Sequence, residues 1–239
     1  MRIARGDNED TPAVAIAMNI DTRSGSEPLR DQFAGRLTAA LTRIDAPLPD
    51  SAVRRLADFL AELLRWNRAY NLTTVTEPDE MIERHVVDSL SIRAHLGGRR
   101  ILDAGTGAGI PGVILAIAEP ERHFVLVDSN RKKIRFLNHL ARSLKLDNVE
   151  PVHGRLESLS LDPMPDQIVA RALAPLPRLV EWLGPWIDSG ARLLAMKGRL
   201  AESERSQVPD AYNVSIKPLD WPGREGARCL VVVSSGGPD

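Results

Sequence analysis

The sequence has a single cysteine, Cys229, among its 239 residues. No disulfide can form within the chain and no zinc site can be built from cysteines, so stability must come from an apolar core. One cysteine is compatible with a reducing compartment, and we expect a cytoplasmic protein. Apolar residues make up 43% of the chain, which suits one main core with a small additional region.

The chain also lacks an excess of either charge and lacks a long apolar run. Its net charge of −1 excludes a general attraction to nucleic acid or to a membrane, so RNA binding would need a local patch. No apolar run approaches the roughly 20 residues that span a bilayer. The apolar stretch 12–20 follows Asp7, Glu9 and Asp10, where a secretion signal would be basic, and we do not interpret it as a signal peptide.

What the chain does have is an alternating-glycine segment at residues 99–112, RRILDAGTGAGIPG. An apolar run ends in Asp103, and Gly105, Gly107 and Gly109 follow before an apolar helix. Glycine has no Cβ and tolerates positive φ, so a ligand can lie against its bare main chain. The unpaired N–H groups at the start of the helix add donors. A strand, a glycine loop and a helix in this order predict a site for a nucleotide-type cofactor.

Two ways of matching the glycines point to two cofactors. Gly107, Gly109 and Gly112 satisfy the dinucleotide pattern G-x-G-x-x-G, and Asp128 lies 21 positions after Gly107. One glycine earlier, Asp103 to Gly109 matches D-x-G-x-G-x-G, which resembles the glycine loop of class I S-adenosylmethionine (SAM) methyltransferases. The SAM pattern is favoured because a dinucleotide loop would begin directly at the end of the strand. A glycine-rich turn without a ligand remains the third interpretation.

Strands and helices alternate over the remainder of the chain, which predicts an α/β fold with a mostly parallel sheet. The helix after the fourth strand is expected to start near Leu176 and to end at Gly184-Pro185. No stretch remains for the substrate domain of a dehydrogenase, which argues against NAD. We expect residues 1–28 to be a disordered extension, 29–96 a helical region and 97–235 the cofactor-binding domain. The expected strands are 100–103, 123–127, 149–152, 166–170, 191–196, 212–219 and 228–234.

Polar side chains follow the predicted strands, where a doubly wound sheet opens its crevice. Asp128 ends the second strand and is placed to accept the hydroxyls of a ribose. After the third strand, Glu157 could meet the adenine amino group and the backbone of Leu156 a ring nitrogen. Arg171 follows the fourth strand. Arg131-Lys132-Lys133, at the start of a helix, either face solvent or hold phosphates.

The helical region contains two further candidate segments. Arg65 to Thr73 alternates arginines with aromatics, which suits stacking on bases, or else Trp66 and Tyr70 close the helix onto the core. His85 and Asp88, three residues apart, could bond to each other, face the cofactor or form a buried pair. No third ligand stands at a metal-site spacing, so we expect no metal.

Seven short segments occur in one order: RWNRAYNLT, RHVVDSL, DAGTGAGIPG, LVDSNRKKIRFL, GRLES, ARAL and MKG. Together, over about Leu56 to Val233, the chain resembles the bacterial GidB/RsmG family of 16S ribosomal RNA guanine-N7 methyltransferases. The resemblance implies a class I, Rossmann-like SAM-dependent methyltransferase with a seven-stranded, mostly parallel sheet and an N-terminal helical extension. It implies SAM as the cofactor, 16S rRNA of the small ribosomal subunit as the partner, and N7 of guanine 527 as the acceptor.

By the same resemblance, the cofactor site comprises Asp103, Gly105, Gly107, Gly109, Ile110, Asp128, Leu156, Glu157 and Arg171. Arg171 would lie where cofactor and substrate meet. Ile110 stands where many relatives carry Phe or Leu, a change that keeps the pocket apolar. Our candidates for RNA contact are Arg65, Arg68, Asn71, His85, Arg155 and Lys197. The arginines and the lysine among them, together with Arg84, Arg171 and Arg199, are the candidates for a phosphate-facing rim.

Guanine N7 has a lone pair in the ring plane and no proton, so the transfer needs no general base and we assign none. The protein must hold N7 in line with the methyl group. Adenine-N6 enzymes need a Pro-Pro loop that this chain lacks, and Cys229, in the last predicted strand, is better explained as a buried thiol than as a nucleophile. The alternatives are a small-molecule SAM methyltransferase, an NAD-dependent oxidoreductase and a SAM-binding regulator. Small size and a near-zero charge favour a monomer.

Overall fold

A computed structural model describes residues 27–222 and 226–236. The predicted disordered extension falls almost wholly on residues 1–26, outside the described residues. The first helix begins at Glu27. The region before the sheet comprises α1 (Glu27–Arg43), α2 (Asp50–Tyr70), α3 (Pro78–Met81), the π-helix η3 (Ile82–Val87), α4 (Asp88–Leu90) and the 3₁₀ turn η4 (Arg93–His95).

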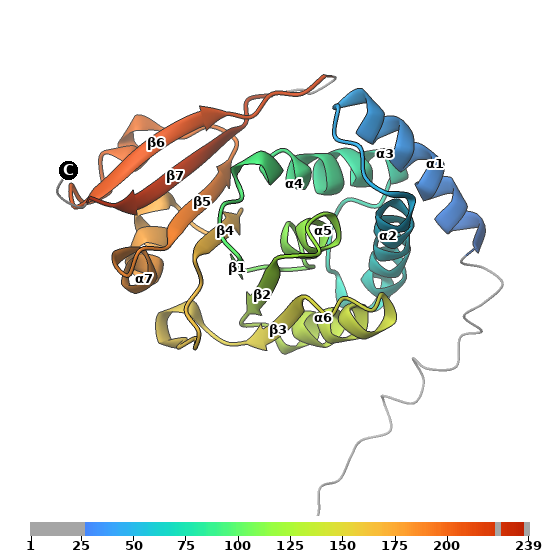
Figure 1. Ribbon diagram of the computed structural model, residues 1–239, viewed down its shortest axis with the longest axis horizontal. Helices are drawn as coiled ribbons and strands as arrows, with labels where there is room; N and C mark the ends of the chain where they lie inside the picture. The colour runs from blue at the N-terminus through green and yellow to red at the C-terminus, as the bar shows by residue number, and fades with distance from the viewer. Residues whose placement is uncertain (1–26, 223–225, 237–239) are drawn as a thin grey trace, which may run out of the picture.

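Within the described residues, seven strands form one sheet in the order β3-β2-β1-β4-β5-β7-β6. The first five pair in parallel, and β7 is antiparallel to both β5 and β6 (Figure 1). The expected α/β fold with a seven-stranded, mostly parallel sheet is confirmed. The strands are β1 (Arg100–Ala104), β2 (His123–Asp128), β3 (Val149–His153), β4 (Gln167–Arg171), β5 (Arg192–Lys197), β6 (Tyr212–Pro218) and β7 (Cys229–Ser235).

Helices cover both faces of the sheet because successive strand residues point to opposite sides. Ile101 and Phe124 pack in a cluster with residues of the helical region, α5 and α6, whereas Leu102 and Val125 pack in a second cluster with α7. Figure 1 shows α5, α6 and α2 on one side and α7 on the other. The helices between the strands are α5 (Gly112–Ala118), α6 (Arg131–Ser143), η5 (Leu156–Ser158), α7 (Leu176–Asp188) and α8 (Glu202–Arg205).

One predicted boundary is wrong by several residues, whereas the predicted ends of the strands differ from the observed ones by at most one residue. Helix α7 does not end at Gly184-Pro185 but continues through Pro185 to Asp188. Proline removes one backbone donor from the helix interior. Trp186 and Ile187 are nevertheless buried in the cluster on this face of the sheet, so packing outweighs the local preference to stop.

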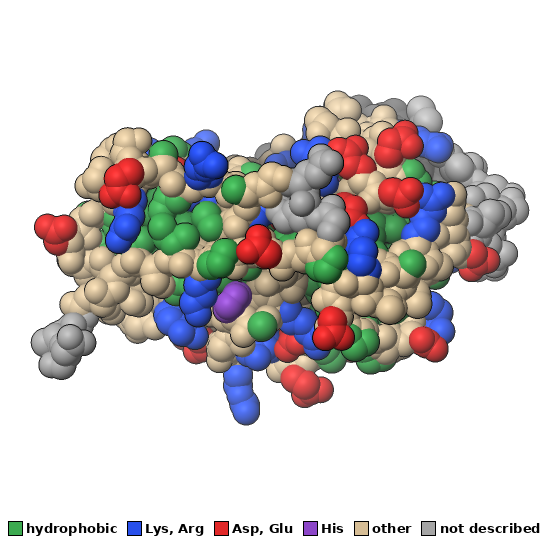
Figure 2. Space-filling view, turned by 90° about the horizontal axis from the view of Figure 1, so that it is seen from above, with side chains coloured by type: hydrophobic (Ala, Val, Ile, Leu, Met, Phe, Trp, Pro, Cys, Tyr) green, Lys and Arg blue, Asp and Glu red, His purple; other side chains and the backbone are tan. Residues whose placement is uncertain are grey.

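The helical region packs on the sheet through α2. Leu56, Leu60 and Leu63, at helical spacing, are completely buried in the cluster that includes α5 and α6. No helix of the described residues is both long enough and apolar enough to cross a membrane. Figure 2, which views the molecule from the side of β6, β7 and α4, shows acidic and basic side chains interspersed on that face.

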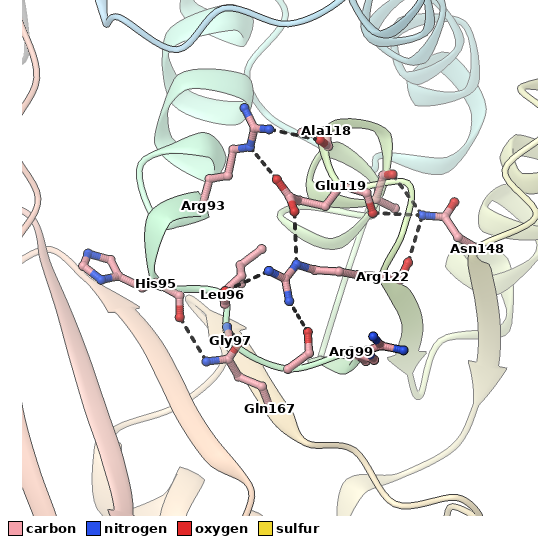
Figure 3. Close-up of polar contacts among 12 residues, drawn as sticks. Arg93, His95, Leu96, Gly97, Arg99, Ala118, Glu119, Arg122, Asn148 and Gln167 are labelled. Atoms are coloured by element: carbon pink, nitrogen blue, oxygen red, sulfur yellow. Dashed lines mark hydrogen bonds and ion pairs between the residues drawn. The ribbon is translucent and has the colours of Figure 1, made fainter.

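At the amino ends of the strands, a polar network fixes the chain as it enters the sheet (Figure 3). Gln167 is buried, donates from Nε2 to the carbonyl of His95 at 3.1 Å and accepts the amide of Gly97 at 3.0 Å. Arg122 donates to the carbonyls of Leu96 and Gly98 and to Glu119, and Glu119 also accepts from Arg93. This end of the sheet is therefore held by side chains that cap backbone groups.

Candidate functional site

The glycine loop connects the carboxyl end of β1 to α5. Gly105, Gly107 and Gly109 have φ of +68°, +61° and +86°, in the left-handed region. A Cβ at Gly107 would come no closer than 3.9 Å to another atom, at Lys133 Nζ, whereas one at Gly112 would lie 2.3 Å from Leu126 Cδ2. Gly112 thus permits close packing inside the fold, whereas no atom crowds the main chain at Gly107, where a ligand can approach.

Asp103, next to the last residue of β1, has one carboxylate oxygen that accepts hydrogen bonds and one that has no partner among the described residues. Its Oδ2 accepts from Thr106 Oγ1 at 2.6 Å and from the Gly112 amide at 2.8 Å. Its Oδ1 is buried and has no hydrogen-bond partner among the described residues. Burial raises the pKa of Asp103 to about 6, although the bonds from Thr106 and Gly112 act in the opposite direction. A cationic group of a ligand would supply the missing partner.

Asp128, at the end of β2, is held beside the glycine loop. Its Oδ2 accepts the Gly107 amide at 3.0 Å and lies 3.4 Å from Lys133 Nζ, while its Oδ1 accepts the Asn130 amide at 2.8 Å. The Gly154 amide, after β3, donates to the Asp128 carbonyl at 3.2 Å. This bond brings the turn with buried Leu156 and exposed Glu157 to the same edge of the sheet.

Arg171 ends β4 and meets a carboxylate from the helical region. Its Nη1 lies 3.4 Å from Asp88 Oδ2 but is buried without a hydrogen bond, and Asp88 Oδ1 accepts from Arg228 Nε at 3.0 Å. Burial lowers the pKa of Arg171, an effect that Asp88 opposes. Asp88 therefore joins α4 to β4 and to the start of β7, elements far apart in the sequence.

His85 lies in the π-helix, buried next to this group. Its Nε2 is 3.1 Å from Thr73 Oγ1, and its Nδ1 has no hydrogen-bond partner among the described residues. Burial, and then the charge of Arg171, lower the pKa of His85 to about 4, so the ring is neutral at neutral pH. π-Helical turns frequently occur at functional sites.

A cavity of about 390 Å³ opens at the carboxyl ends of β4 and β5. Small side chains, including Ala170 and Ala195, leave room in its walls. Its charged lining is mostly basic, with Asp88 as its acid, and consists of Arg84, Asp88, Arg171, Lys197, Arg199 and Arg228. Lys197 is engaged with Glu204 and the Ala174 carbonyl. The cavity thus offers an anionic ligand several positive charges.

The structure brings most of the predicted site residues to one edge of the sheet. Asp103, the glycines, Asp128 and Leu156-Glu157 lie at the ends of β1 to β3, and Arg171 and Lys197 lie at the ends of β4 and β5. Arg155 is an exposed residue just after β3.

Three other predicted residues lie on or next to α2. Arg65 pairs with Glu62 at 2.5 Å, and Arg68 and Asn71 are exposed at the carboxyl end of that helix. Trp66 packs on Tyr70, Phe136 and His139, with ring centroids 5.0–5.5 Å apart, which favours the packing interpretation over base stacking.

Sequence reasoning missed Arg228, which lies 140 positions from its partner Asp88. A lone cation before an apolar strand was the only local signal. No group of three or more potential metal ligands occurs in the part of the chain that the structure describes.

Comparison with known proteins agrees with this geometry. Residues 52–230 match the family model GidB, described as rRNA small subunit methyltransferase G. The chain is 41% identical over 199 residues to ribosomal RNA small subunit methyltransferase G of Enterobacter sp. (strain 638), covering 83% of this chain and 96% of that protein. It is 39% identical over 201 residues to the protein of that name from Escherichia coli (strain K12 / DH10B), covering 84% and 97%.

Solved structures show the fold. The glycopeptide N-methyltransferase MtfA, complexed with SAM, matches with a TM-score of 0.54 and 12% identity over 64% of this chain and 88% of that one. The tRNA methyltransferase TrmK of B. subtilis matches with a TM-score of 0.51 and 12% identity over 62% and 65%. The sheet is that of class I methyltransferases.

Proposed function

From the premise that this chain belongs to the GidB family, rRNA small subunit methyltransferase G, we propose that it methylates N7 of one guanine in small-subunit rRNA. The family and the class I fold make SAM the methyl donor. By the resemblance of its motifs, the acceptor is guanine 527 of 16S rRNA. The observation that carries the proposal is a basic cavity of about 390 Å³ at the carboxyl ends of β4 and β5. The glycine loop lies at the same edge of the sheet, after β1.

The residues at the ends of β1 to β3 suit SAM. The unpaired Oδ1 of Asp103 would accept from the ammonium of the methionine part, and the bare main chain at Gly107 would lie against the ligand. Asp128 would accept from the ribose hydroxyls, and Leu156 and Glu157 would meet the adenine. When bound, SAM supplies a methyl group on a positively charged sulfur.

The cavity residues would hold the acceptor base. Because N7 attacks with its own lone pair, the protein has to orient the base and exclude water, and it moves no proton. A guanine in a paired stem would first have to leave its stack. Arg171 and Arg228 would contact the base or its phosphate, and Asp88 between them offsets the positive charge that the base acquires.

Mapping of methylated nucleotides tests the proposal. Purified protein, SAM and small-subunit rRNA from cells without this gene should give N7-methylguanine at one position. Arg171→Ala should lower the rate at least about 100-fold, the usual scale for loss of a positioned charged donor, with an unchanged circular dichroism spectrum. Arg192→Ala, an exposed arginine at the amino end of β5, is the matched control and should keep the wild-type rate. Unmodified rRNA, or a methyl group on another atom, would contradict the proposal.

A further inference from the structure

Helix α6 carries basic residues at both of its ends. It carries Arg131, Lys132, Lys133, Arg135 and Arg142 and no acidic residue between 131 and 143. Lys133 is partly buried beside Asp128, and the other four cations are exposed. Within the described residues, none of these four forms an ion pair with an acid.

Three of these arginines form a line. At about 100° per residue, Arg131, Arg135 and Arg142 fall within roughly 40° of one another around the helix. The opposite side of the helix holds the buried Leu137 and Leu140. At about 1.5 Å per residue, the line extends over roughly 16 Å. We call these three residues the α6 arginine row.

The row starts at the cofactor site. Asn130 caps α6 by accepting the Lys132 amide at 2.9 Å, and Asp128 of the site lies just before this cap. In the next turn, Lys133 Nζ reaches back to Asp128 at 3.4 Å. The unpaired amides at the start of α6 add positive potential at the same place. A chain of negative charge leaving the site would therefore meet Arg131 and Arg135 first and Arg142 two turns further along the helix.

Three cations of α1, by contrast, are paired with acids of neighbouring elements. Arg30 pairs with Asp58 at 2.7 Å, Arg36 pairs with Asp79 at 2.6 Å, and Arg43 pairs with Glu83. Figure 2 shows the face around β6, β7 and α4 with both signs interspersed. Since the whole chain has a net charge of −1, the row is a local concentration of positive charge.

We propose that the α6 arginine row binds the phosphate backbone of the RNA that flanks the methylated nucleotide. This inference rests on the proposed function, and it adds a surface outside the cavity on which the substrate RNA docks. Arginine presents a planar fork that suits phosphate, and three arginines spread over about 16 Å can contact several phosphates of one RNA strand. A protein partner is less suited, because protein interfaces are enriched in aromatic and apolar side chains, and the exposed positions of α6 are polar.

The test compares two triple variants in equilibrium binding to protein-free 16S rRNA. One removes the row: Arg131→Gln, Arg135→Gln and Arg142→Gln. The control removes the same charge from exposed arginines elsewhere: Arg54→Gln, Arg99→Gln and Arg192→Gln. For the row variant, the slope of log K against log salt should decrease by about 2, since each phosphate contact contributes roughly 0.7–0.9. Its affinity at moderate salt should fall at least tenfold, with an unchanged affinity for S-adenosylhomocysteine (SAH).

Each outcome decides the proposal. If the row variant keeps the slope of the wild type, or loses no more than the control, the row does not bind phosphates. Weakened binding to small subunits that carry ribosomal proteins, with normal binding to protein-free rRNA, would assign the row to a protein instead. If the wild type binds rRNA without forming N7-methylguanine, the proposed function fails while the binding comparison still decides the role of the row.

Discussion

Polar side chains occur at both ends of the sheet, but the two ends differ in whether these side chains have hydrogen-bond partners. At the amino ends of the strands, Gln167, Arg122 and Asn148 donate to carbonyls, and Glu119 accepts from two arginines (Figure 3). At or next to the carboxyl ends lie three of the six buried side-chain atoms that have no hydrogen-bond partner among the described residues: Asp103 Oδ1, Arg171 Nη1 and His85 Nδ1.

We interpret this difference as a division between polar groups that serve the fold and polar groups that we propose bind a ligand. A buried polar group without a partner costs about 1–3 kcal/mol, so folding stability alone would not gather such groups at one edge. A bound cofactor and substrate can supply the missing partners. Substitutions at the two ends of the sheet and a pH series test whether ligand binding depends on the carboxyl ends alone, in order from the largest expected effect on ligand binding to the smallest.

Asp128→Ala should have the largest effect. The variant removes the proposed acceptor for the ribose and the carboxylate that holds the Gly107 amide. We expect the affinity for SAH to fall about 100-fold, the scale of two hydrogen bonds to a charged group. Calorimetry measures it, and Asp147→Ala, an exposed acid before β3, is the control. An unchanged SAH affinity would remove Asp128 from the site.

Gly107→Ala should weaken SAH binding about tenfold or more. The added methyl group would cover the main chain that we propose contacts the ligand, and it would strain the left-handed backbone. Gly190 is a matched control: it has a φ of +104°, and its added Cβ would meet nothing within 4 Å, as that of Gly107 would meet nothing closer than 3.9 Å. Both alanine variants should lose about 1 kcal/mol of unfolding free energy. Equal SAH affinities in the two variants would show that Gly107 serves only the turn.

The pH dependence of SAH binding should report Asp103. The pKa of its carboxyl is raised to about 6, so it is ionised above that pH and can pair with the ligand's ammonium, whereas below it the carboxyl is neutral. We expect the affinity to fall up to about tenfold from pH 7 to pH 5, and Asp103→Asn should flatten this profile. His85 stays neutral over this range. His153→Gln, beside Ser129 at the same edge, controls for an exposed imidazole; a flat wild-type profile would refute the assignment.

Gln167→Ala should lower the free energy of unfolding and leave the affinity for SAH unchanged. It removes the partners of the Gly97 amide and the His95 carbonyl at the amino ends of the strands. We expect a loss of about 1–3 kcal/mol in urea unfolding and an unchanged SAH affinity. Gln207→Ala, at an exposed position, should change neither. A loss of SAH affinity in Gln167→Ala would mean that the two ends of the sheet are not independent.

Prediction from the sequence succeeded where neighbours along the chain carry the information. Short patterns within single segments predict the glycine loop, the acid at the end of β2 and the succession of strands along the chain. It was wrong at the end of α7, because Pro185 is a local signal and the burial of Trp186 and Ile187 is not. It also left Trp66 open between stacking and packing, which only the contact with Phe136 on α6 distinguishes.

The sequence by itself determined the class of fold and the position of the glycine loop, since the hydrophobic period and the glycine spacing are properties of a few neighbouring residues. Tertiary structure alone decided which charges meet. Asp88 comes from the helical region, Arg171 from the end of β4 and Arg228 from just before β7. Because β7 is antiparallel to β5, its first residue lies beside the carboxyl end of β5, at the same edge as Arg171. The physical reason is that burial and ion pairing depend on elements that only the completed sheet places side by side.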